Sequence, residues 1–310
     1  MTPTVGVDLG GTKVFAALVE GGEVTAEAKA NTPTGGPNAV VEAIAECIGR
    51  LKAGPLRALG VGAPGVVDIA AGTVGSAPNL VGFRDPVPLA ALLAERLGID
   101  RVVIDNDANV GTLGEHRHGA GRASGDLLGV FVGTGVGGGI MLDGALRHGP
   151  GGLAGEIGHM VVAEGGRPCG CGRLGHLEAY AGRAGLEREA RTRYAAGQTT
   201  ALVDLAGAGR MKSSVFAKAL AAGDEVALEL LDQAVAALGA ALASVVALVD
   251  VELVVMGGGL ADRLGPGFVG RVEQATRERL FVLTGPVRVV PAALGDRAGA
   301  VGAALLVQDD

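Results

Sequence analysis

Residues 4–20 read TVGVDLGGTKVFAALVE, in which two apolar runs flank the segment Gly10-Gly11-Thr12-Lys13. The runs, Thr4–Leu9 and Val14–Glu20, have the length and composition of buried strands. Gly21-Gly22 then predicts a turn into a third strand, Glu23–Ala30. Glycine permits positive φ and leaves backbone N–H groups uncovered. The first turn is therefore either an ordinary hairpin turn or a nest that binds an anion such as phosphate.

The same arrangement occurs a second time in the chain. Leu127–Val132 is a predicted strand, Gly133-Thr134-Gly135 a turn, and Gly139–Leu142 a second strand. A second pair of segments, Ala58–Asp68 and Glu252–Asp262, can also be aligned, because both begin as a strand and run into a glycine-rich turn. A strand–turn–strand unit repeated in the same order predicts two similar α/β domains with a cleft between them.

Helices separate the predicted strands. Apolar residues recur at helical spacing in Asn38–Leu51 and Leu89–Leu97, and a strand is predicted at Val102–Ile104. Strands that alternate with helices indicate an α/β fold with a parallel or mixed sheet. The expected domains are a smaller one over 1–109, completed by a C-terminal helix at about 297–310, and a larger one over 110–296 with a helical insertion.

Composition excludes several classes of protein. With 48% hydrophobic residues, the 310-residue chain can fill two cores and is not a disordered protein. Its 26 Lys and Arg against 33 Asp and Glu give 26 − 33 = −7. Nucleic-acid binding needs clustered cations, and stacking on single strands needs aromatic residues, which make up only 3% of the chain. We expect no nucleic-acid partner.

No segment predicts export or membrane insertion. Met1–Asp8 lacks the charged start and apolar stretch of a signal peptide. The longest apolar run, Ala234–Val249, is shorter than the roughly 20 residues of a membrane span and predicts a buried helix. Three cysteines are too few for a disulfide framework. We therefore expect a cytoplasmic protein with no membrane partner.

Two familiar phosphate motifs can be tested against the glycine turns. No Lys follows a Gly anywhere in the chain, so the P-loop sequence Gly-Lys-Ser/Thr is absent. Gly133, Gly135 and Gly138 satisfy the dinucleotide pattern G-x-G-x-x-G. That pattern must open a helix, whereas Ile140–Gly144 reads as a strand and a turn. A Rossmann domain is therefore not favoured.

Four potential metal ligands fall within a short glycine-rich stretch: His159, Cys169, Cys171 and His176. Zn²⁺ takes four nitrogen and sulfur ligands in a tetrahedron, and these residue types suit it. We predict a zinc site that is structural, because no coordination position is left for water. The alternative is a loop with two free thiols and two unrelated histidines.

Acidic residues follow the strand at Val102–Ile104. Asp107, in the segment Asp105-Asn106-Asp107, is either a general base facing the cleft or the N-cap of a helix, and the residues alone leave both open. On the helix expected next, we predict that Glu115-His116-Arg117-His118 is a solvated face and not a second metal site.

The glycine, acidic and cysteine motifs together resemble the ROK family of repressors and sugar kinases, most of all its bacterial glucokinases. The resemblance extends from about residue 4 to about residue 306. The segments that carry it are Asp8-Leu9-Gly10-Gly11-Thr12-Lys13, Asn106-Asp107-Ala108-Asn109, Gly133-Thr134-Gly135-x-Gly137-Gly138-Gly139, Gly155-Glu156-Ile157-Gly158-His159, Cys169-Gly170-Cys171-Gly172 and Gly257-Gly258-Gly259.

The resemblance implies the two-domain ribonuclease-H-like fold shared by hexokinase, actin and Hsp70 ATPases, with an interdomain cleft. It implies transfer of the γ-phosphate of ATP to the 6-hydroxyl of glucose, with Mg²⁺ as cofactor and Asp107 as general base. The positions implied for sugar binding are Gly65, Asn79, Asn106, Asp107, Glu156, His159 and Glu178. Those implied for ATP and Mg²⁺ are Asp8, Gly10, Gly11, Thr12, Lys13, Thr134, Gly135 and Gly258.

Some alternatives stay open within the family. The sugar could be N-acetylglucosamine, N-acetylmannosamine, mannose or fructose. A sugar-sensing transcription regulator would carry an N-terminal helix-turn-helix, for which a first strand at Thr4 leaves no room. His176 replaces the usual third cysteine of the family, but imidazole also binds zinc. The resemblance further implies a homodimer or homotetramer.

Overall fold

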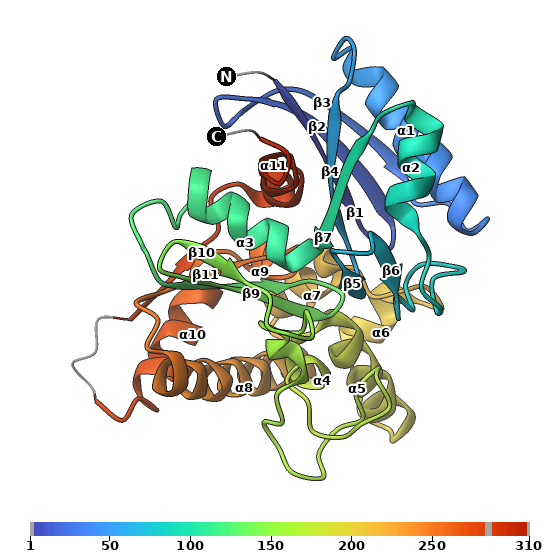
Figure 1. The fold of residues 1–310 in the computed structure, drawn as a ribbon. Coiled ribbons are helices and arrows are strands. Elements are labelled where there is room, and N and C mark those ends of the chain that lie inside the picture. The colour runs from blue at the N-terminus through green and yellow to red at the C-terminus, as the bar shows by residue number, and fades with distance from the viewer. Residues whose placement is uncertain (1–2, 283–286, 309–310) are drawn as a thin grey trace. The chain divides into compact units, whose positions relative to one another are not determined.

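The structure is a computed structural model that describes residues 3–282 and 287–308 (Figure 1). Its internal contacts divide the chain into two compact units. Unit 1 contains Met1–Gly125, Gly139–Gly155 and Ala293–Asp310, and unit 2 contains Asp126–Gly138 and Glu156–Ala292. The domain limits expected above, 1–109 with 297–310 and 110–296, stay a prediction.

The first sheet consists of β1 (Thr4–Leu9), β2 (Lys13–Glu20), β3 (Glu23–Asn31), β4 (Ala58–Ala63) and β7 (Arg101–Asn106). Their order is β3-β2-β1-β4-β7, with β1, β4 and β7 parallel. The register pairs Asp8 with Gly62 and Gly62 with Asp105. The carboxyl ends of these three strands therefore meet at one edge of the sheet, where Asp8 and Asp107 are brought together.

Helices cover both faces of this sheet (Figure 1). The helices are α1 (Pro37–Leu51), α2 (Leu89–Leu97), α3 (Asp107–His118) and α11 (Ala298–Leu305). Alternate residues of β2 enter two separate cores, because successive side chains of a strand point to opposite faces. Val14 packs in the core that contains α1 and α2, and Phe15 packs against α11.

The second sheet consists of β8 (Leu127–Val132), β9 (Val136–Leu142), β10 (Ala145–Arg147), β11 (Leu253–Gly257) and β12 (Arg288–Pro291). Its order, β10-β9-β8-β11-β12, repeats that of the first sheet strand for strand. The prediction of α/β sheets built on a repeated strand–turn–strand unit is confirmed.

One part of the predicted repeat is wrong. After the glycine turn, β4 continues into β5 (Val66–Asp68), which pairs with β6 (Thr73–Gly75). After the equivalent turn, β11 continues into a helix, α9 (Ala261–Leu264). The strand halves of the two aligned segments correspond, whereas the halves after the turn do not. Similar residue types after a glycine turn do not by themselves fix strand or helix.

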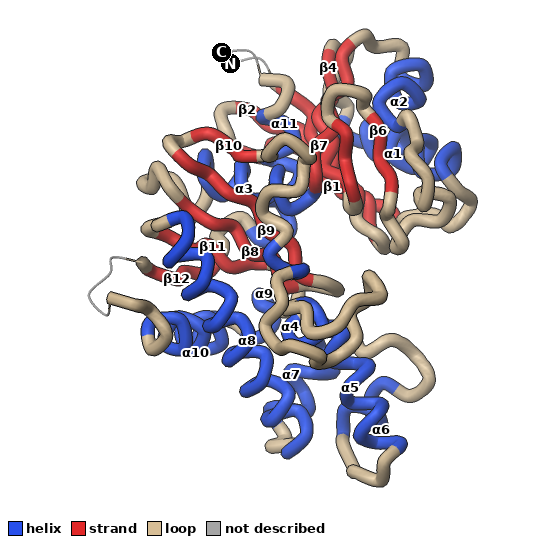
Figure 2. The backbone as a smooth tube through the Cα atoms, turned by 60° about the horizontal axis from the view of Figure 1, so that its bottom comes forward, coloured by secondary structure: helices blue, strands red, loops and turns tan. Residues whose placement is uncertain are grey.

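Unit 2 carries the predicted helical insertion (Figure 2). Besides α9, the α-helices of unit 2 are α4 (Glu178–Ala181), α5 (Arg183–Ala195), α6 (Ala201–Ala206), α7 (Ser213–Ala221), α8 (Glu225–Val249) and α10 (Pro266–Arg277). Helix α8 is longer than the apolar run Ala234–Val249 that predicts it. By length and composition alone, it could cross a membrane. Its packing against α4, α7 and α10 is that of a core helix, as predicted.

The prediction of a solvated face at Glu115–His118 is wrong for its first two residues. Glu115 is fully buried and His116 nearly so. The Glu115 carboxylate accepts hydrogen bonds from the backbone N–H groups of Ala120, Ala293 and Leu294, at 2.7 to 3.0 Å. These bonds satisfy the buried charge and hold the segment that leads into α11 against α3.

Helix α11, whose sequence is AGAVGAAL, lies unusually close to its neighbours. A Cβ atom placed on Gly6, Gly60 or Gly302 would overlap the carbonyl oxygen of Ala300, Ala303 or Val110 respectively. Backbone therefore meets backbone where α11 packs on β1, β4 and α3, and only glycine fits at these positions.

We predict that Gly302→Ala destabilises the protein by about 1–3 kcal/mol, because the added methyl group must push α11 away from α3. The matched control is Gly49→Ala, an exposed glycine inside α1 with open space around its Cβ position. That change should stabilise by about 0.5–1 kcal/mol through helix propensity. Urea unfolding of both variants measures this, and equal effects of the two changes would contradict the packing argument.

Candidate active site

The turn after β1 is closed and braced by hydrogen bonds. The Gly10 N–H donates to the Lys13 carbonyl at 2.9 Å. The Thr32 hydroxyl donates to the Gly10 carbonyl at 2.6 Å, and the Thr32 N–H to the Thr12 carbonyl at 3.1 Å. Because these carbonyls are occupied, the turn is held in one shape while the Thr12 side chain remains exposed.

Gly11 of this turn lies against Asn79. A Cβ atom on Gly11 would come within 2.7 Å of the Asn79 Cβ. The absence of a side chain at Gly11 therefore brings one predicted sugar ligand against a predicted phosphate turn.

Asn106 shapes the start of α3. It is the N-cap residue, and its side-chain oxygen accepts from the N–H groups of Ala108 and Asn109 at 2.9 and 3.3 Å. Its amide nitrogen donates to the Gly65 carbonyl at 3.2 Å. The alternative that Asp107 is the N-cap is therefore wrong. Asp107 is the first residue of the helix, where its carboxylate accepts from the Ala108 N–H at 2.8 Å.

The carboxyl group of Asp8 lies in an unfavourable position for a charge. Burial raises its pKa to about 7, with a further contribution from the like charge of Asp107, and Lys13 offsets part of this rise. The chain makes room for this carboxyl group, since a Cβ on Gly299 would lie 2.8 Å from its Cγ. Lys13 itself forms an ion pair with Asp296 at 2.9 Å. Unit 1 thus holds three acidic side chains, Asp8, Asp107 and Asp296, and the ammonium group of Lys13 beside one glycine turn.

A pair that the sequence gave no reason to expect supports this strand end. Asp105 is almost fully buried, and one of its carboxylate oxygens lies 2.7 Å from the Nε2 of His148. The other oxygen accepts from the Asn106 N–H at 2.7 Å and the Asn109 amide at 3.0 Å. Asp105 therefore ties the loop after β10 to the start of α3. Only the alternation of β7 side chains could have indicated that it points inward.

The second glycine turn, after β8, has its own carboxylate neighbour. The Gly133 N–H donates to the Gly135 carbonyl at 2.9 Å. Glu178 accepts from the Val136 N–H at 3.2 Å, and a Cβ on Gly135 would overlap the same carboxylate. Gly258, with a φ of 92°, comes similarly close to the backbone of Val132 at the end of β8.

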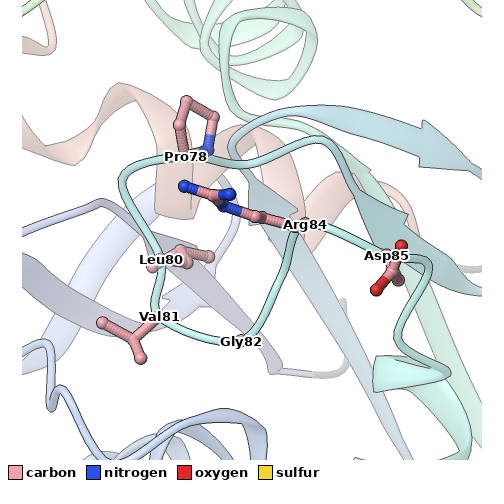
Figure 3. Close-up of a pocket in the computed structure, with 6 residues that line it drawn as sticks. All are labelled: Pro78, Leu80, Val81, Gly82, Arg84 and Asp85. Atoms are coloured by element: carbon pink, nitrogen blue, oxygen red, sulfur yellow. The ribbon is translucent and has the colours of Figure 1, made fainter.

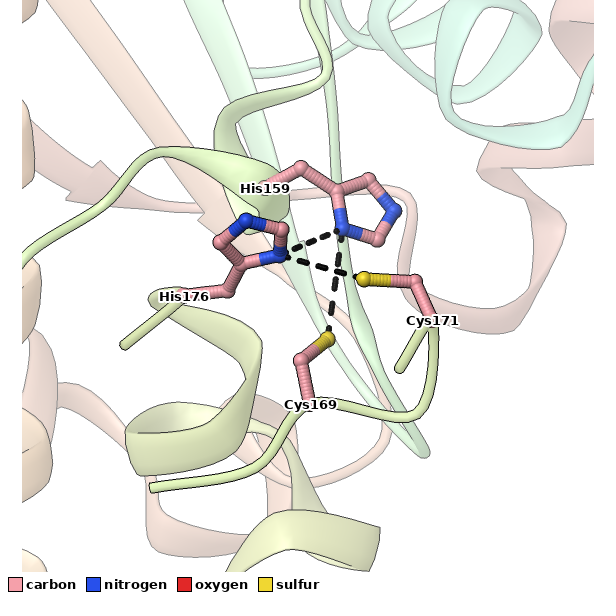
Figure 4. A group of neighbouring side chains, drawn as sticks. All are labelled: His159, Cys169, Cys171 and His176. Atoms are coloured by element: carbon pink, nitrogen blue, oxygen red, sulfur yellow. Dashed lines mark hydrogen bonds between the residues drawn. The ribbon is translucent and has the colours of Figure 1, made fainter. Parts of the chain in front are cut away.

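The four predicted zinc ligands come together in unit 2 (Figure 4). One ligand atom from each of His159, Cys169, Cys171 and His176 lies within 4.8 Å of all the others. The two Nδ1 atoms are 3.2 Å apart, and the Cys171 Sγ lies 3.3 Å from the Nδ1 of His176. Ligands about 2.0–2.3 Å from a tetrahedral Zn²⁺ have spacings of this size, so the residues fit the ion.

The same cluster lies beside two predicted sugar carboxylates. The Nε2 of His159, at the end of a short 3-10 helix, η1 (Ile157–His159), is 3.9 Å from the Glu156 carboxylate. The Cys169 thiol is 3.5 Å from the Glu178 carboxylate. Burial raises the pKa of Glu156, partly offset by His159 and reinforced by the charge of Glu178. The cysteine loop and the two carboxylates therefore form one polar cluster within unit 2.

A separate surface hollow of about 450 Å³ is present in unit 1. It is lined by Pro78, Leu80, Val81, Gly82, Arg84 and Asp85 (Figure 3). These residues flank Asn79 in the chain, but the hollow contains none of the predicted site residues. We assign it no part in the site.

Comparison with known proteins decides the family. The model of the ROK family matches residues 4–310. The chain belongs to the ROK family. A glucokinase of Streptomyces coelicolor is 35% identical to it, with 99% of this chain and 98% of the relative covered. An N-acetylmannosamine kinase of Escherichia coli O1:K1 is 32% identical, with 99% of each covered.

Solved structures agree with this assignment. A ROK family glucokinase from Streptomyces griseus, solved with glucose and AMPPNP, superposes with a TM-score of 0.85 at 35% identity. The comparison covers 98% of each chain. The fold expected from the family, that of hexokinase and actin, is thereby confirmed.

We predict that Asp8→Asn makes this ROK protein more stable at pH 8 in the absence of ATP and metal. The native pKa of about 7 exceeds the ordinary value of 3.8. The protonated group thus favours folding below about pH 4, and that contribution is lost as the pH rises through 7. Because the side chain is partly exposed, we expect a gain of about 1–2 kcal/mol instead of the full value for such a shift.

The gain should shrink at pH 5, where native Asp8 is protonated. Thermal unfolding at both pH values measures it, with the exposed Asp100→Asn variant as the control. A gain of equal size at pH 5 and pH 8, or a loss at pH 8, would contradict the raised pKa of the Asp8 carboxyl group.

Proposed function

We propose that the protein is an ATP-dependent hexose kinase that phosphorylates the 6-hydroxyl of glucose. The observation that carries the proposal is the pair of acidic residues Asp8 and Asp107 beside a glycine-rich turn, where the charge of Asp107 adds to the effect of burial in raising the pKa of Asp8. The names of the relatives support it, because one is a glucokinase and a related structure holds glucose and AMPPNP. The relative named N-acetylmannosamine kinase makes that sugar the second candidate.

Each predicted residue receives a role in this proposal. Amide and carboxylate groups suit the hydroxyls of a neutral sugar, and glycine N–H groups with threonine hydroxyls suit phosphate. Sugar binding is assigned to Gly65, Asn79, Asn106, Asp107, Glu156, His159 and Glu178. ATP binding is assigned to Gly10, Gly11, Thr12, Lys13, Thr134, Gly135 and Gly258.

Asp107 acts as the general base. It accepts the proton of the 6-hydroxyl while that oxygen forms a bond to the γ-phosphorus, and the bond from this phosphorus to the ADP oxygen breaks. The N-terminus of α3 stabilises the negative form of the carboxylate that this step requires. Mg²⁺, when bound, neutralises charge on the phosphates, and Asp8 is the residue placed to hold it through water. The remaining residues act by positioning.

The histidine and cysteine cluster binds structural zinc in this proposal. Its Nδ1 atoms face the other ligands, which leaves the Nε2 of His159 directed away from the cluster, 3.9 Å from the Glu156 carboxylate. A metal on Nδ1 fixes the orientation of the ring and leaves Nε2 to meet a sugar hydroxyl. Zinc thus organises sugar binding and takes no part in phosphoryl transfer.

The function is tested by ADP release with ATP, Mg²⁺ and a panel of glucose, mannose, fructose, N-acetylglucosamine and N-acetylmannosamine. We predict turnover with glucose, and a fall in kcat of at least about 10²-fold for Asp107→Asn, because the base is lost while the shape is kept. Asp100→Asn, the same change at the other end of β7, should retain full activity. Turnover with none of the sugars would exclude the proposed kinase function. A fully active Asp107→Asn variant would exclude Asp107 as the general base.

For zinc, we predict about one ion per chain by elemental analysis. Cys169→Ala or His176→Ala should lose the ion and raise the KM for the sugar by at least about tenfold, with little change in the KM for ATP. Cys47→Ala is the matched control, since this buried cysteine lies in α1 of unit 1. A metal-free preparation with full activity, or equal changes in both constants, would contradict this division of labour.

A further inference from the structure

An arginine outside the predicted site is bound to the second glycine turn. Arg183, the first residue of α5, donates from its guanidinium to the Thr134 hydroxyl oxygen at 2.7 Å. Its backbone N–H donates to the Gly133 carbonyl, and the Ala184 N–H donates to the Thr134 carbonyl, both at 3.0 Å. The start of α5 and the turn are therefore held together by both backbone and side chain.

The repeated topology shows why a cation is needed from elsewhere at this turn. In the first turn, Thr12 is followed by Lys13, which supplies a positive charge. In the second turn, Thr134 is followed by Gly135. A lysine in place of Gly135 would bring its Cβ into overlap with the Glu178 carboxylate, so that this carboxylate would have to move. The second turn therefore has no cation of its own, and Arg183 brings one from α5.

The hydrogen-bond chemistry of this contact has a definite direction. A guanidinium group only donates, so its bond to Thr134 uses a lone pair of the hydroxyl oxygen. The single hydroxyl proton of Thr134 is left to donate to another acceptor. Within the described residues, the second bond of the guanidinium goes to a neutral group, the Met211 carbonyl at 2.7 Å. Glu187, one turn along α5, pairs with Arg191 instead, at 3.0 Å. Glu187 acts on Arg183 only through its charge, which partly offsets the lowering of the Arg183 pKa by burial.

We propose that Arg183 is a positioning residue for the ATP phosphates. It fixes the Thr134 hydroxyl as a donor toward a phosphate oxygen and adds positive charge at a turn whose own residues, Gly133-Thr134-Gly135, include no cation. The inference rests on the proposed kinase function and extends it to a residue on a different element. An anionic polyphosphate group is the ligand chemistry that a donating hydroxyl, glycine N–H groups and a guanidinium share.

The test is steady-state kinetics of Arg183→Ala, Arg183→Gln and Arg183→Lys with ATP and the preferred sugar. Arg183→Ala should raise the KM for ATP by about tenfold or more and leave the KM for the sugar within about twofold. Arg183→Lys keeps the charge and a donor, so it should recover most of the ATP affinity. Arg183→Gln keeps a donor without the charge and should recover less.

Arg191→Ala is the matched control. Arg191 lies on the same helix and, like Arg183, anchors the segment after α6, through the carbonyls of Gly207 and Gly209. The described structure gives it no bond to the glycine turn. If Arg183 only anchored the segment after α6, Arg183→Ala and Arg191→Ala would have the same effect, and this result would overturn the proposal. Equal changes in the KM for ATP and the KM for the sugar in Arg183→Ala would also overturn it.

A double-mutant cycle tests whether Arg183 acts through Thr134. Thr134→Val removes the hydroxyl and nearly keeps the side-chain shape. If the proposal holds, the double variant should be clearly less impaired in ATP binding than the product of the two single effects. Strict additivity would overturn it.

An inactive wild type would reject the kinase function itself, whereas an active wild type with a silent Arg183→Ala change would reject only the role of Arg183.

Discussion

The site depends on one steric constraint that occurs in both units: the turn after the first strand has no room for a side chain at one position. Gly11 lies against Asn79, and Gly135 lies against Glu178. In each unit, a polar side chain assigned to the sugar therefore packs directly on a turn assigned to phosphate. A larger residue at either position would force its neighbour to move, so the contact accounts for glycine at these two positions.

Around this contact, the sheet of unit 1 concentrates negative charge. Parallel strands in register bring Asp8, Asp105 and Asp107 to one edge. The three carboxylates are stabilised differently. Asp105 is satisfied by His148, Asn106 and Asn109, and Asp107 by the start of α3. Asp8 is the least well compensated, and its raised pKa reflects this. Strain of this kind is expected where a cation or a polyphosphate is to be bound.

Unit 2 arranges its polar groups through the cysteine loop and α5. Glu178 contacts the Cys169 thiol on one side and the turn at Gly135 and Val136 on the other. It therefore joins the cysteine and histidine cluster to the turn after β8, while Arg183 contacts the same turn from α5. His176 lies in this cluster, because one of its ring nitrogens is within 4.8 Å of a ligand atom from each of the other three residues. The Glu178 carboxylate thus lies between the cysteine loop and the glycine turn within this unit.

The sequence alone determined the strands that flank the glycine turns, the turns themselves and the cysteine–histidine set, because these depend on local periodicity and on spacing along the chain. It also indicated the repeat, although the segment after Gly259 became a helix instead of a strand. Only the tertiary structure decided which polar residues are buried. Glu115 and His116 read as a solvated face, but Glu115 is bonded by the backbone of residues 293–294 and His116 lies against the Ser124 carbonyl, and Asp105 gained His148 from a distant loop. Arg183 and Thr134, 49 residues apart, likewise meet only in the folded chain. Burial and hydrogen bonding depend on contacts between distant segments, which local sequence patterns do not encode.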